Sequence, residues 1–429
     1  MKIIADLHLH SKYSRATSPK MEVVTLTEWG KKKGIDLIAT GDITHPEYVK
    51  ELKEQLVEDG SGFLTLRPFG KLRAGEDQGD KIIKFVLCGE ISCIYKHKDK
   101  TRRQHHLLFF PDFASVDQFN QELENRGCNI RSDGRPILGL SSKEILQILL
   151  DVNSEAFLVP AHVWTPWFAL FGSKSGYDSV EECFEDLAPE IFAMETGLSS
   201  DPAMNWRLSA LDNITLISNS DAHSPLNLGR EANVFDFQEF TFAELKQILK
   251  DEDPKKFLYT IEFYPQEGKY HYDGHRSCKF SCSPEESLKH KNICPVCKKP
   301  LVLGVDHRVV ALADRELGFK PENKIPFKSI IPLYEIISEV LGVGKQSKRV
   351  MNLYEEMIMV GGNEFNILLE LDKEKIATIG NDLIAEAIMR MRAGKIYAIP
   401  GYDGEFGRVT VFNNEDLNHF KPKQKELFL

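Results

Sequence analysis

Short apolar segments alternate with longer stretches of helical spacing through the first half of the chain, and this alternation constrains the fold more than any other feature. The pattern is typical of βα units, in which strands are joined by helices into a parallel sheet or barrel. The apolar segments lie at 3–4, 37–39, 85–87, 107–110, 156–159, 191–193 and 215–217. We therefore expect an α/β domain in this half of the chain.

Polar residues that can bind metals follow nearly every apolar segment. A barrel gathers the carboxyl ends of its strands at one mouth, so residues far apart in the sequence would meet there. The pattern predicts a single site. Its candidate residues are His8, His10, Asp42, His45, Glu90, His162, Glu195, Asp221 and His223.

The pair His8-Leu9-His10 comes at the end of the first apolar segment. Side chains two residues apart on a strand share a face, so both imidazoles can bind one ion. Imidazoles together with carboxylates suit zinc or manganese, and a metal with an open coordination position makes hydroxide from water near neutral pH. The pattern indicates metal-dependent hydrolysis of a phosphoester.

Some candidate residues also have ordinary structural interpretations. Glu195 is either a ligand or a hydrogen-bond partner of one, and His45 could belong to a simple turn. His105 and His106 are adjacent on an expected strand, so only one of them can face the site.

Four of the eight cysteines lie within twenty positions, and in a cytosolic protein such crowding indicates a metal site rather than disulfides. Two chelating pairs separated by a short loop predict a structural zinc ion with four thiolate ligands. His275 or His290 could replace one thiol. The expected ligands are Cys278, Cys282, Cys294 and Cys297.

The formal net charge of −10 argues mildly against nucleic-acid binding over the whole surface, but the charge is unevenly distributed. Residues 255–349 contain 17 Lys and Arg against 11 Asp and Glu, so this block is basic. No apolar run is long enough to cross a bilayer, and the first residues lack the pattern of a signal peptide. We expect a cytoplasmic protein that does not contact membranes.

Helical spacing returns after about residue 309, and the turn between two expected helices carries glycines. Backbone N–H groups beside glycine can approach a phosphate closely, although glycine after a helix is first of all a C-cap. A second glycine-rich loop, at 400–408, suits a ligand contact or a tight hairpin. The candidate phosphate-binding residues are Gly342, Gly344, Lys345, Lys348, Arg349 and Arg408.

The metal-binding pattern resembles the polymerase and histidinol phosphatase family, which opens with His-x-His and closes with Asp-x-His, here Asp221-Ala222-His223. The resemblance implies a seven-stranded (βα) barrel and further ligands at Glu90, His106 and His162. Two positions depart from the family pattern, because Asp42 stands where a His is usual and Ala16 where another ligand is often found. These departures argue against a full three-metal cluster.

The whole chain resembles the endonuclease Q family, most clearly at 6–18, at 160–168, in Cys294-Pro295-Val296-Cys297 and at 400–404. That resemblance implies three domains: a barrel at 1–262, a zinc module with four cysteine ligands at 263–305 and a mainly helical DNA-binding domain at 306–429. It also implies incision of double-stranded DNA on the 5′ side of a deaminated base (uracil, hypoxanthine or xanthine) or of an abasic site.

The predicted catalytic centre holds divalent ions, Zn²⁺ or Mn²⁺/Mg²⁺. Its expected ligands are His8, His10, Asp42, Glu90, His106, His162, Glu195, Asp221 and His223, and all of these except His106 and Glu195 are also assigned to catalysis. Nuclease action on a damaged base requires a pocket for that base. Its candidate residues are Trp164, Trp167, Phe168, Phe171 and Tyr402, although the four that follow His162 could equally be core residues.

Two other functions use parts of the same pattern. One is a small-molecule phosphatase of the histidinol phosphate type, which would need neither the Cys-rich module nor the basic block. The other is a DNA-binding scaffold with an inactive barrel, which the near-complete ligand set argues against. Replication or repair proteins are possible partners of the nuclease.

Overall fold

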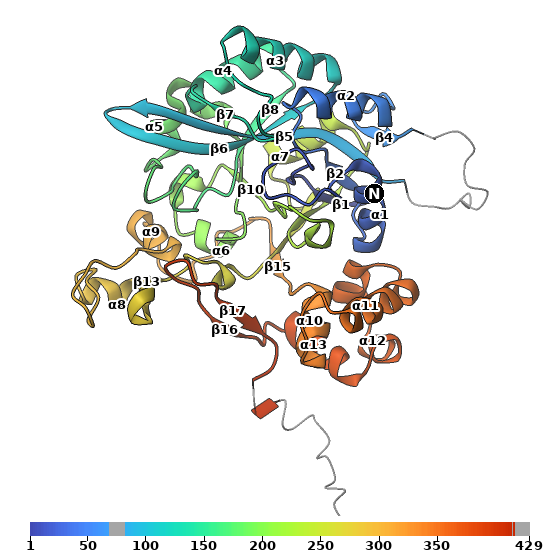
Figure 1. Ribbon diagram of the computed structural model, residues 1–429, viewed down its shortest axis with the longest axis vertical. Helices are drawn as coiled ribbons and strands as arrows, with labels where there is room; N and C mark the ends of the chain where they lie inside the picture. The colour runs from blue at the N-terminus through green and yellow to red at the C-terminus, as the bar shows by residue number, and fades with distance from the viewer. Residues whose placement is uncertain (68–81, 414, 417–429) are drawn as a thin grey trace, which may run out of the picture.

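The computed structural model describes residues 1–67, 82–413 and 415–416. Figure 1 shows an α/β body from the first 260 or so residues, a Cys-rich segment below it and a helical bundle beside that segment. All seven apolar segments of the first half lie in strands or directly beside them. The mixed α/β class predicted from the sequence is therefore confirmed.

The main sheet has eleven strands and mixed pairing. Strand β1 pairs in parallel with β2, and β2 pairs in parallel with β5. Strands β6, β8 and β11 run antiparallel to their neighbours. The strands are β1 (Lys2–Asp6), β2 (Leu37–Ala39), β3 (Leu56–Glu58), β4 (Leu64–Leu66), β5 (Lys84–His97), β6 (Lys100–Phe110), β7 (Ile137–Leu138), β8 (Phe157–Pro160), β11 (Ala232–Asp236), β12 (Phe257–Glu262) and β15 (Phe327–Ser329).

A tight turn explains one of the antiparallel pairings. Strands β5 and β6 are joined by the two residues Lys98 and Asp99, both with positive φ, and so short a turn can connect only antiparallel strands. Strands β9 (Ala193–Glu195) and β10 (Thr215–Ile217) pair in parallel as a separate two-stranded sheet. The closed seven-stranded barrel expected from the family resemblance stays a prediction.

Helices cover the body, and several of them show the local signals that start and stop a helix. Helix α4 begins with a capping box between Ser141 and Glu144, and α1 ends at Gly34 in the left-handed conformation. The helices of the body are α1 (Val23–Lys33), α2 (Pro46–Gln55), α3 (Phe113–Asn125), α4 (Ser142–Val152), α5 (Val180–Phe184), α6 (Pro202–Asn205) and α7 (Phe242–Asp251).

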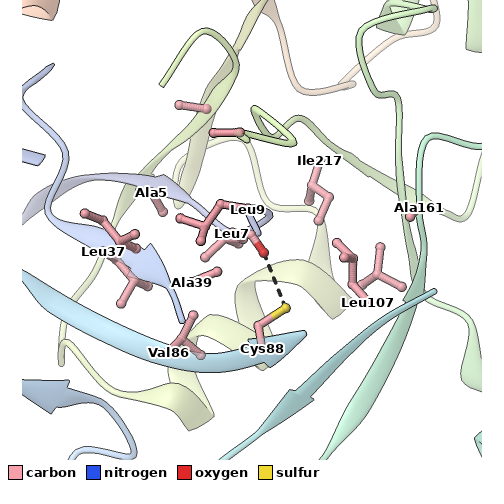
Figure 2. Packing of buried hydrophobic residues seen from close by; sticks show 14 of the residues in the cluster. Ala5, Leu7, Leu9, Leu37, Ala39, Val86, Cys88, Leu107, Ala161 and Ile217 are labelled. Carbon is pink, nitrogen blue, oxygen red and sulfur yellow. Dashed lines mark hydrogen bonds between the residues drawn. The ribbon is translucent and has the colours of Figure 1, made fainter. Parts of the chain in front are cut away.

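Figure 2 shows the apolar core beneath the strand ends. Leu7 and Leu9 point into it and are almost fully buried, as are Val86 on β5 and Leu107 on β6. Because side chains alternate along an extended chain, burying Leu7 and Leu9 directs the histidines at 8 and 10 to the opposite side. The core thus positions the two imidazoles.

The second half of the chain contains small elements followed by a helical bundle. The expected helical character of this region is observed, and a short hairpin from its end returns to pack beside the Cys-rich segment. The elements are β13 (Asp273–His275), β14 (Phe280–Cys282), α8 (Pro284–Lys289), α9 (Val305–Leu312), α10 (Leu333–Leu341), α11 (Lys348–Gly361), α12 (Lys373–Ile379), α13 (Asp382–Arg392), β16 (Tyr397–Ile399) and β17 (Arg408–Thr410). Among the described residues, no helix combines the length and apolar character needed to span a bilayer.

Candidate functional site

Seven histidine, aspartate and glutamate side chains converge at the strand ends and form three overlapping groups. Within each group, the potential ligand atoms all lie within 4.8 Å of one another. His10 and Glu90 each belong to two groups, so neighbouring ions could share them. The groups are His8, His10 and Glu90; His10, Asp221 and His223; and Glu90, His105 and His162.

The first two groups surround the imidazole of His10. Its Nε2 lies 3.2 Å from Glu90 Oε2 and 3.2 Å from Asp221 Oδ1, and His8 Nε2 lies 3.7 Å from the same two oxygens. The His223 ring stacks at a tilt 4.4 Å from the His10 ring. The imidazole nitrogens and carboxylate oxygens are therefore close enough together to bind the same metal ion.

The third group lies on the other side of Glu90. His105 Nδ1 is 2.7 Å and His162 Nε2 is 3.0 Å from Glu90 Oε1, and the two imidazole nitrogens are 3.2 Å apart. Asp221 and His162 have positive φ, which costs free energy for residues other than glycine and is common where a chain positions functional groups.

Three buried atoms of the cluster lack a hydrogen-bond partner in the part of the chain that the structure describes. They are the Nε2 atoms of His8 and His10 and Oδ1 of Asp221. A buried polar atom without a partner costs about 1–3 kcal/mol, so native proteins usually provide one. Metal ions would satisfy all three atoms, and the mixed imidazole and carboxylate set fits divalent ions.

Two carboxylates predicted as ligands instead orient the histidines. His8 Nδ1 donates to Glu195 at 3.0 Å, and His10 Nδ1 donates to Asp42 at 3.2 Å. These bonds place the proton on Nδ1 and leave each Nε2 free to bind a metal. Asp42 and Glu195 belong to none of the three groups, so their assignment as metal ligands stays a prediction.

Hydrogen bonds from the surrounding chain occupy both carboxylates. Asp42 accepts from the backbone N–H of Ser11 at 2.7 Å, and Glu195 accepts from the backbone N–H of His162 and the side chain of Asn219, both at 2.8 Å. These contacts explain why neither carboxylate turns toward the ligand groups.

The structure contradicts the assignment of His106 as a ligand, because its neighbour His105 faces the cluster in its place. His106 is fully buried on the opposite face of β6, where its Nε2 hydrogen-bonds with Ser142 Oγ at 2.7 Å. Burial lowers the pKa of His106 to about 3. His45, left open by the sequence, contacts the backbone oxygen of Arg131 at 3.2 Å and joins none of the groups.

The electrostatics of the cluster favour bound cations. Burial opposes ionisation of Glu90, but His105 and Arg135 hold its pKa well below its usual range. Burial likewise opposes ionisation of Asp221, yet His8 and His10 lower its pKa. Both carboxylates therefore carry negative charge in the cluster.

Arg135 is a site residue that no sequence signal indicated. Its guanidinium donates to Glu90 Oε2 at 2.8 Å, and its side chain is about one-third exposed. It follows Gly134, at which an added Cβ would overlap Asp42 Oδ2 at 2.3 Å. The small residue allows this loop to bring a cation against the ligand cluster.

The aromatic residues after His162 divide into two pairs. Trp164 and Phe171 are fully buried with ring centroids 4.9 Å apart, so their proposed place in a base pocket was wrong and they are core residues. Phe168 lies 4.7 Å from the ring of His105. Trp167 is 39% exposed and meets Tyr270 edge to face at 5.8 Å.

The Cys-rich segment brings together three of the four predicted thiols. Cys278, Cys294 and Cys297 form a group with His275, and Cys282 is not part of it. The register of the hairpin explains the difference. It pairs His275 with Phe280 near the turn and Asp273 with Cys282 at the far end, and Cys282 packs against Cys294 and Leu301. The four-thiol site stays a prediction, and the alternative that a histidine replaces one thiol fits the group that the structure brings together.

The glycine turn between α10 and α11 is exposed. Gly342 has φ +66° and caps α10, as the alternative interpretation required, and Lys345 pairs with Glu335 at 2.6 Å. Lys348 and Arg349 lie exposed in the first turn of α11. Arg408 lies on β17, and the backbone of Tyr402 bridges to Tyr272 beside the Cys-rich segment.

Comparisons with known proteins connect this chain to two uncharacterised proteins. The model of the MJ0043 C-terminal domain matches residues 332–395. The protein MJ0043 of Methanocaldococcus jannaschii is 33% identical over 272 residues, which are 62% of this chain and 32% of that protein. The chain thus matches about a third of the length of this relative. YqxK of Bacillus subtilis is 28% identical over 426 residues, 95% of this chain and 99% of that protein.

Two solved structures are similar over essentially the whole length. The lesion-specific endonuclease PfuEndoQ of Pyrococcus furiosus is 32% identical with a TM-score of 0.83, covering 98% of this chain and 100% of that one. Endonuclease Q in complex with a 27-mer duplex, which carries an abasic lesion at the active site, has the same identity and TM-score and covers 100% of both chains. Identity of this size over full-length chains shows that this protein belongs to the endonuclease Q family.

Proposed function

We propose that this protein is a DNA repair endonuclease that hydrolyses the phosphodiester on the 5′ side of a damaged nucleotide. The observation that carries the proposal is the ligand cluster with its three unpartnered buried atoms, in a chain similar over its full length to lesion-specific endonucleases. Because a solved relative holds duplex DNA with an abasic lesion at its active site, we include abasic sites among the substrates, together with uracil, hypoxanthine and xanthine.

The seven clustered residues would hold divalent catalytic ions. Imidazole-rich sites suit Zn²⁺ or Mn²⁺ better than Mg²⁺, which prefers oxygen ligands. Such ions lower the pKa of water and stabilise charge on a phosphate undergoing in-line attack. The expected products are 3′-hydroxyl and 5′-phosphate ends. The proposed ligands are His8, His10, Glu90, His105, His162, Asp221 and His223.

The chain's own residues prepare this site. Asp42 and Glu195 hold the imidazoles of His10 and His8 in the tautomer that leaves Nε2 unprotonated. Arg135 supplies a partly exposed cation beside Glu90, where its guanidinium can donate to a nonbridging phosphate oxygen. The apolar core below the cluster excludes water from the other side.

Recognition of a damaged nucleotide requires a surface that accepts it outside the duplex, and flipping costs a few kcal/mol. Phe168 contacts the ring of His105 in the cluster, and Trp167, its neighbour in the chain, is exposed. Tyr402 lies on the segment that returns from the C-terminal region. We assign the base contact to these three side chains.

The Cys-rich segment would hold a structural zinc ion through His275, Cys278, Cys294 and Cys297, since three thiolates and one imidazole fit tetrahedral zinc. We retain the domain limits 1–262, 263–305 and 306–429. Phosphate contacts in the third domain are assigned to the exposed turn after α10, the first residues of α11 and the first residue of β17. These are Gly342, Gly344, Lys345, Lys348, Arg349 and Arg408.

A nicking assay tests the proposal. Labelled duplexes containing an abasic site, deoxyuridine or no lesion are incubated with the purified protein and added Mn²⁺, Zn²⁺ or Mg²⁺. Cleavage 5′ of the lesion, with little cleavage of the intact duplex, is expected. Turnover of p-nitrophenyl phosphate without nicking would support the phosphatase instead, and DNA binding without either reaction would support the scaffold.

A further inference from the structure

The tip of the β5–β6 hairpin forms a basic cleft away from the metal ligands. The cleft has a volume of about 720 Å³ and lies between the hairpin, the loop 172–178 and the start of α9. Figure 1 shows this hairpin extending well beyond the rest of the sheet. Six cationic side chains and two acidic ones line it, and the cationic ones are Lys98, Lys100, Arg102, Arg103, Lys174 and Arg308.

Four of these cations are available to an external anion. Lys98, Lys100, Arg103 and Lys174 have no carboxylate within salt-bridge distance anywhere in residues 1–67, 82–413 and 415–416. Of the two acidic groups, Asp178 is already paired with a guanidinium from α9. The cleft therefore has an uncompensated positive charge within a protein that is acidic overall.

The remaining two arginines hold the cleft in shape. Arg308 donates to the backbone oxygens of Phe171 and Tyr177 at 2.9 and 3.0 Å. The guanidinium of Arg102 lies 3.9 Å from the centre of the Tyr177 ring, whose hydroxyl contacts His97 Nδ1 at 2.8 Å. The hairpin and the loop are thus fastened together, so an incoming ligand would meet a preorganised surface.

The register of the hairpin fixes the distance from the cleft to the catalytic centre. Glu90 on β5 and His105 on β6 are ligand candidates near the base of the hairpin, and Arg103 shares the face of His105. At about 3.3 Å per residue, Lys100 and Lys98 lie roughly 17 to 20 Å from His105 along the strand direction. B-DNA rises about 3.4 Å per base pair, so this span equals about five to six base pairs.

We infer that this cleft binds the phosphate backbone of one duplex arm, about five to six base pairs from the bond that is cut. The inference rests on the proposed nuclease function. It adds an anchoring surface on the α/β body itself, separate from the glycine turn of the helical bundle. Phosphate contacts position a duplex without reading its sequence, so the cleft should contribute equally to the binding of duplexes with different lesions.

A triple variant tests the inference. Lys98→Ala, Lys100→Ala and Lys174→Ala are combined, which leaves both structural arginines in place. Lys50→Ala, Arg126→Ala and Lys250→Ala together form the matched control, because they remove the same charge from exposed positions elsewhere on the α/β body. Binding of the metal-loaded proteins to abasic-site duplexes is measured by fluorescence anisotropy over a range of salt concentrations.

The cleft variant should bind the duplex at least about tenfold more weakly than wild type. A plot of log affinity against log salt concentration should also be less steep for this variant, by about 0.9 for each phosphate that it no longer neutralises. The control variant should match wild type. Shortening the relevant arm from about twelve to about four base pairs should weaken wild type but not the cleft variant. At saturating enzyme, the single-turnover cutting rate should be unchanged, because the cleft does not touch the ligand cluster.

The outcomes separate the inference from the function on which it rests. A cleft variant with wild-type affinity, salt slope and arm-length dependence would overturn the inference even if the wild-type protein nicks damaged DNA. Equal weakening in both triple variants would also overturn it, since net charge alone would then explain the loss. Absence of nicking by the wild-type protein would instead count against the proposed function, whatever the binding shows.

Discussion

Replacing His105 and His106 one at a time should separate catalysis from stability at two adjacent positions. His105→Ala removes a ligand candidate 2.7 Å from Glu90, so it should lower metal content and slow nicking. Loss of a residue that merely supports a ligand costs about 10- to 100-fold in activity or metal affinity, so loss of a ligand should exceed about 100-fold. The fold should persist, because the ring lines the site and not the main core.

His106→Ala should have the opposite result. The substitution removes a fully buried ring that packs 5.6 Å from the ring of Phe184, together with the 2.7 Å hydrogen bond to Ser142. A lost hydrogen bond contributes about 1 kcal/mol, and the cavity left by a large side chain about 1–3 kcal/mol more. We therefore expect a loss of roughly 2–4 kcal/mol in the free energy of unfolding, with the nicking rate within a few-fold of wild type.

The measurements are nicking of an abasic duplex under single-turnover conditions, metal content by mass spectrometry and unfolding in denaturant. His106→Asn is a useful companion, since it keeps a polar group near Ser142 and should recover part of the lost stability. The reasoning would be refuted if His106→Ala lost its metal and activity while His105→Ala kept both, because that result would place the opposite face of β6 at the catalytic centre.

Three further outcomes follow from the structure. His8→Ala and Asp221→Ala should each abolish nicking while the protein stays folded by circular dichroism, and activity retained with normal metal content would remove the proposed site. Cys294→Ser should lose one tightly bound zinc per chain, whereas Cys282→Ser should keep it, and equal zinc loss in both would restore the four-thiol site. Burial raises the pKa of Glu262 from 4.5 to about 8, so its protonated form favours the folded state and stability should fall as pH rises from about 4.5 to about 8. Denaturant unfolding at several pH values should show this fall weakened in Glu262→Gln, and an unchanged pH profile would contradict the assignment.

The sequence predicted where the site is but not the role of each residue in it. Strand ends were recognisable because apolar segments precede them, and the two-residue spacing placed His8 and His10 on one face. Asp42 and Glu195 occupy equivalent strand-end positions, yet hydrogen bonds from Ser11 and from Asn219 hold them behind the histidines. Those contacts join segments far apart in the sequence, so local pattern could not reveal them.

The remaining differences have the same origin in pairing and register. Alternation showed that only one residue of the pair at 105 and 106 could face inward, but it could not tell which, because the register of β6 against β5 decides the face. Cys282 and His275 both lie on the hairpin of β13 and β14, and spacing alone could not tell which of them completes the group of three thiols. Arg135 has no motif at all, since it reaches the cluster from a loop.

The β5–β6 hairpin connects the two proposals of catalysis and anchoring. Eleven paired positions run from Leu87 opposite Phe110 to His97 opposite Lys100, so the ligands at its base and the cleft at its tip belong to one rigid element. Removing one residue from each strand would turn every side chain beyond the deletion to the other face and destroy the cleft. Removing two from each strand would keep the faces and bring the tip about 7 Å closer to the cluster. If the cleft holds the backbone, such a shortened hairpin should shift the shortest arm that supports tight binding by about two base pairs. An unshifted minimum would mean that the arm does not run along the hairpin.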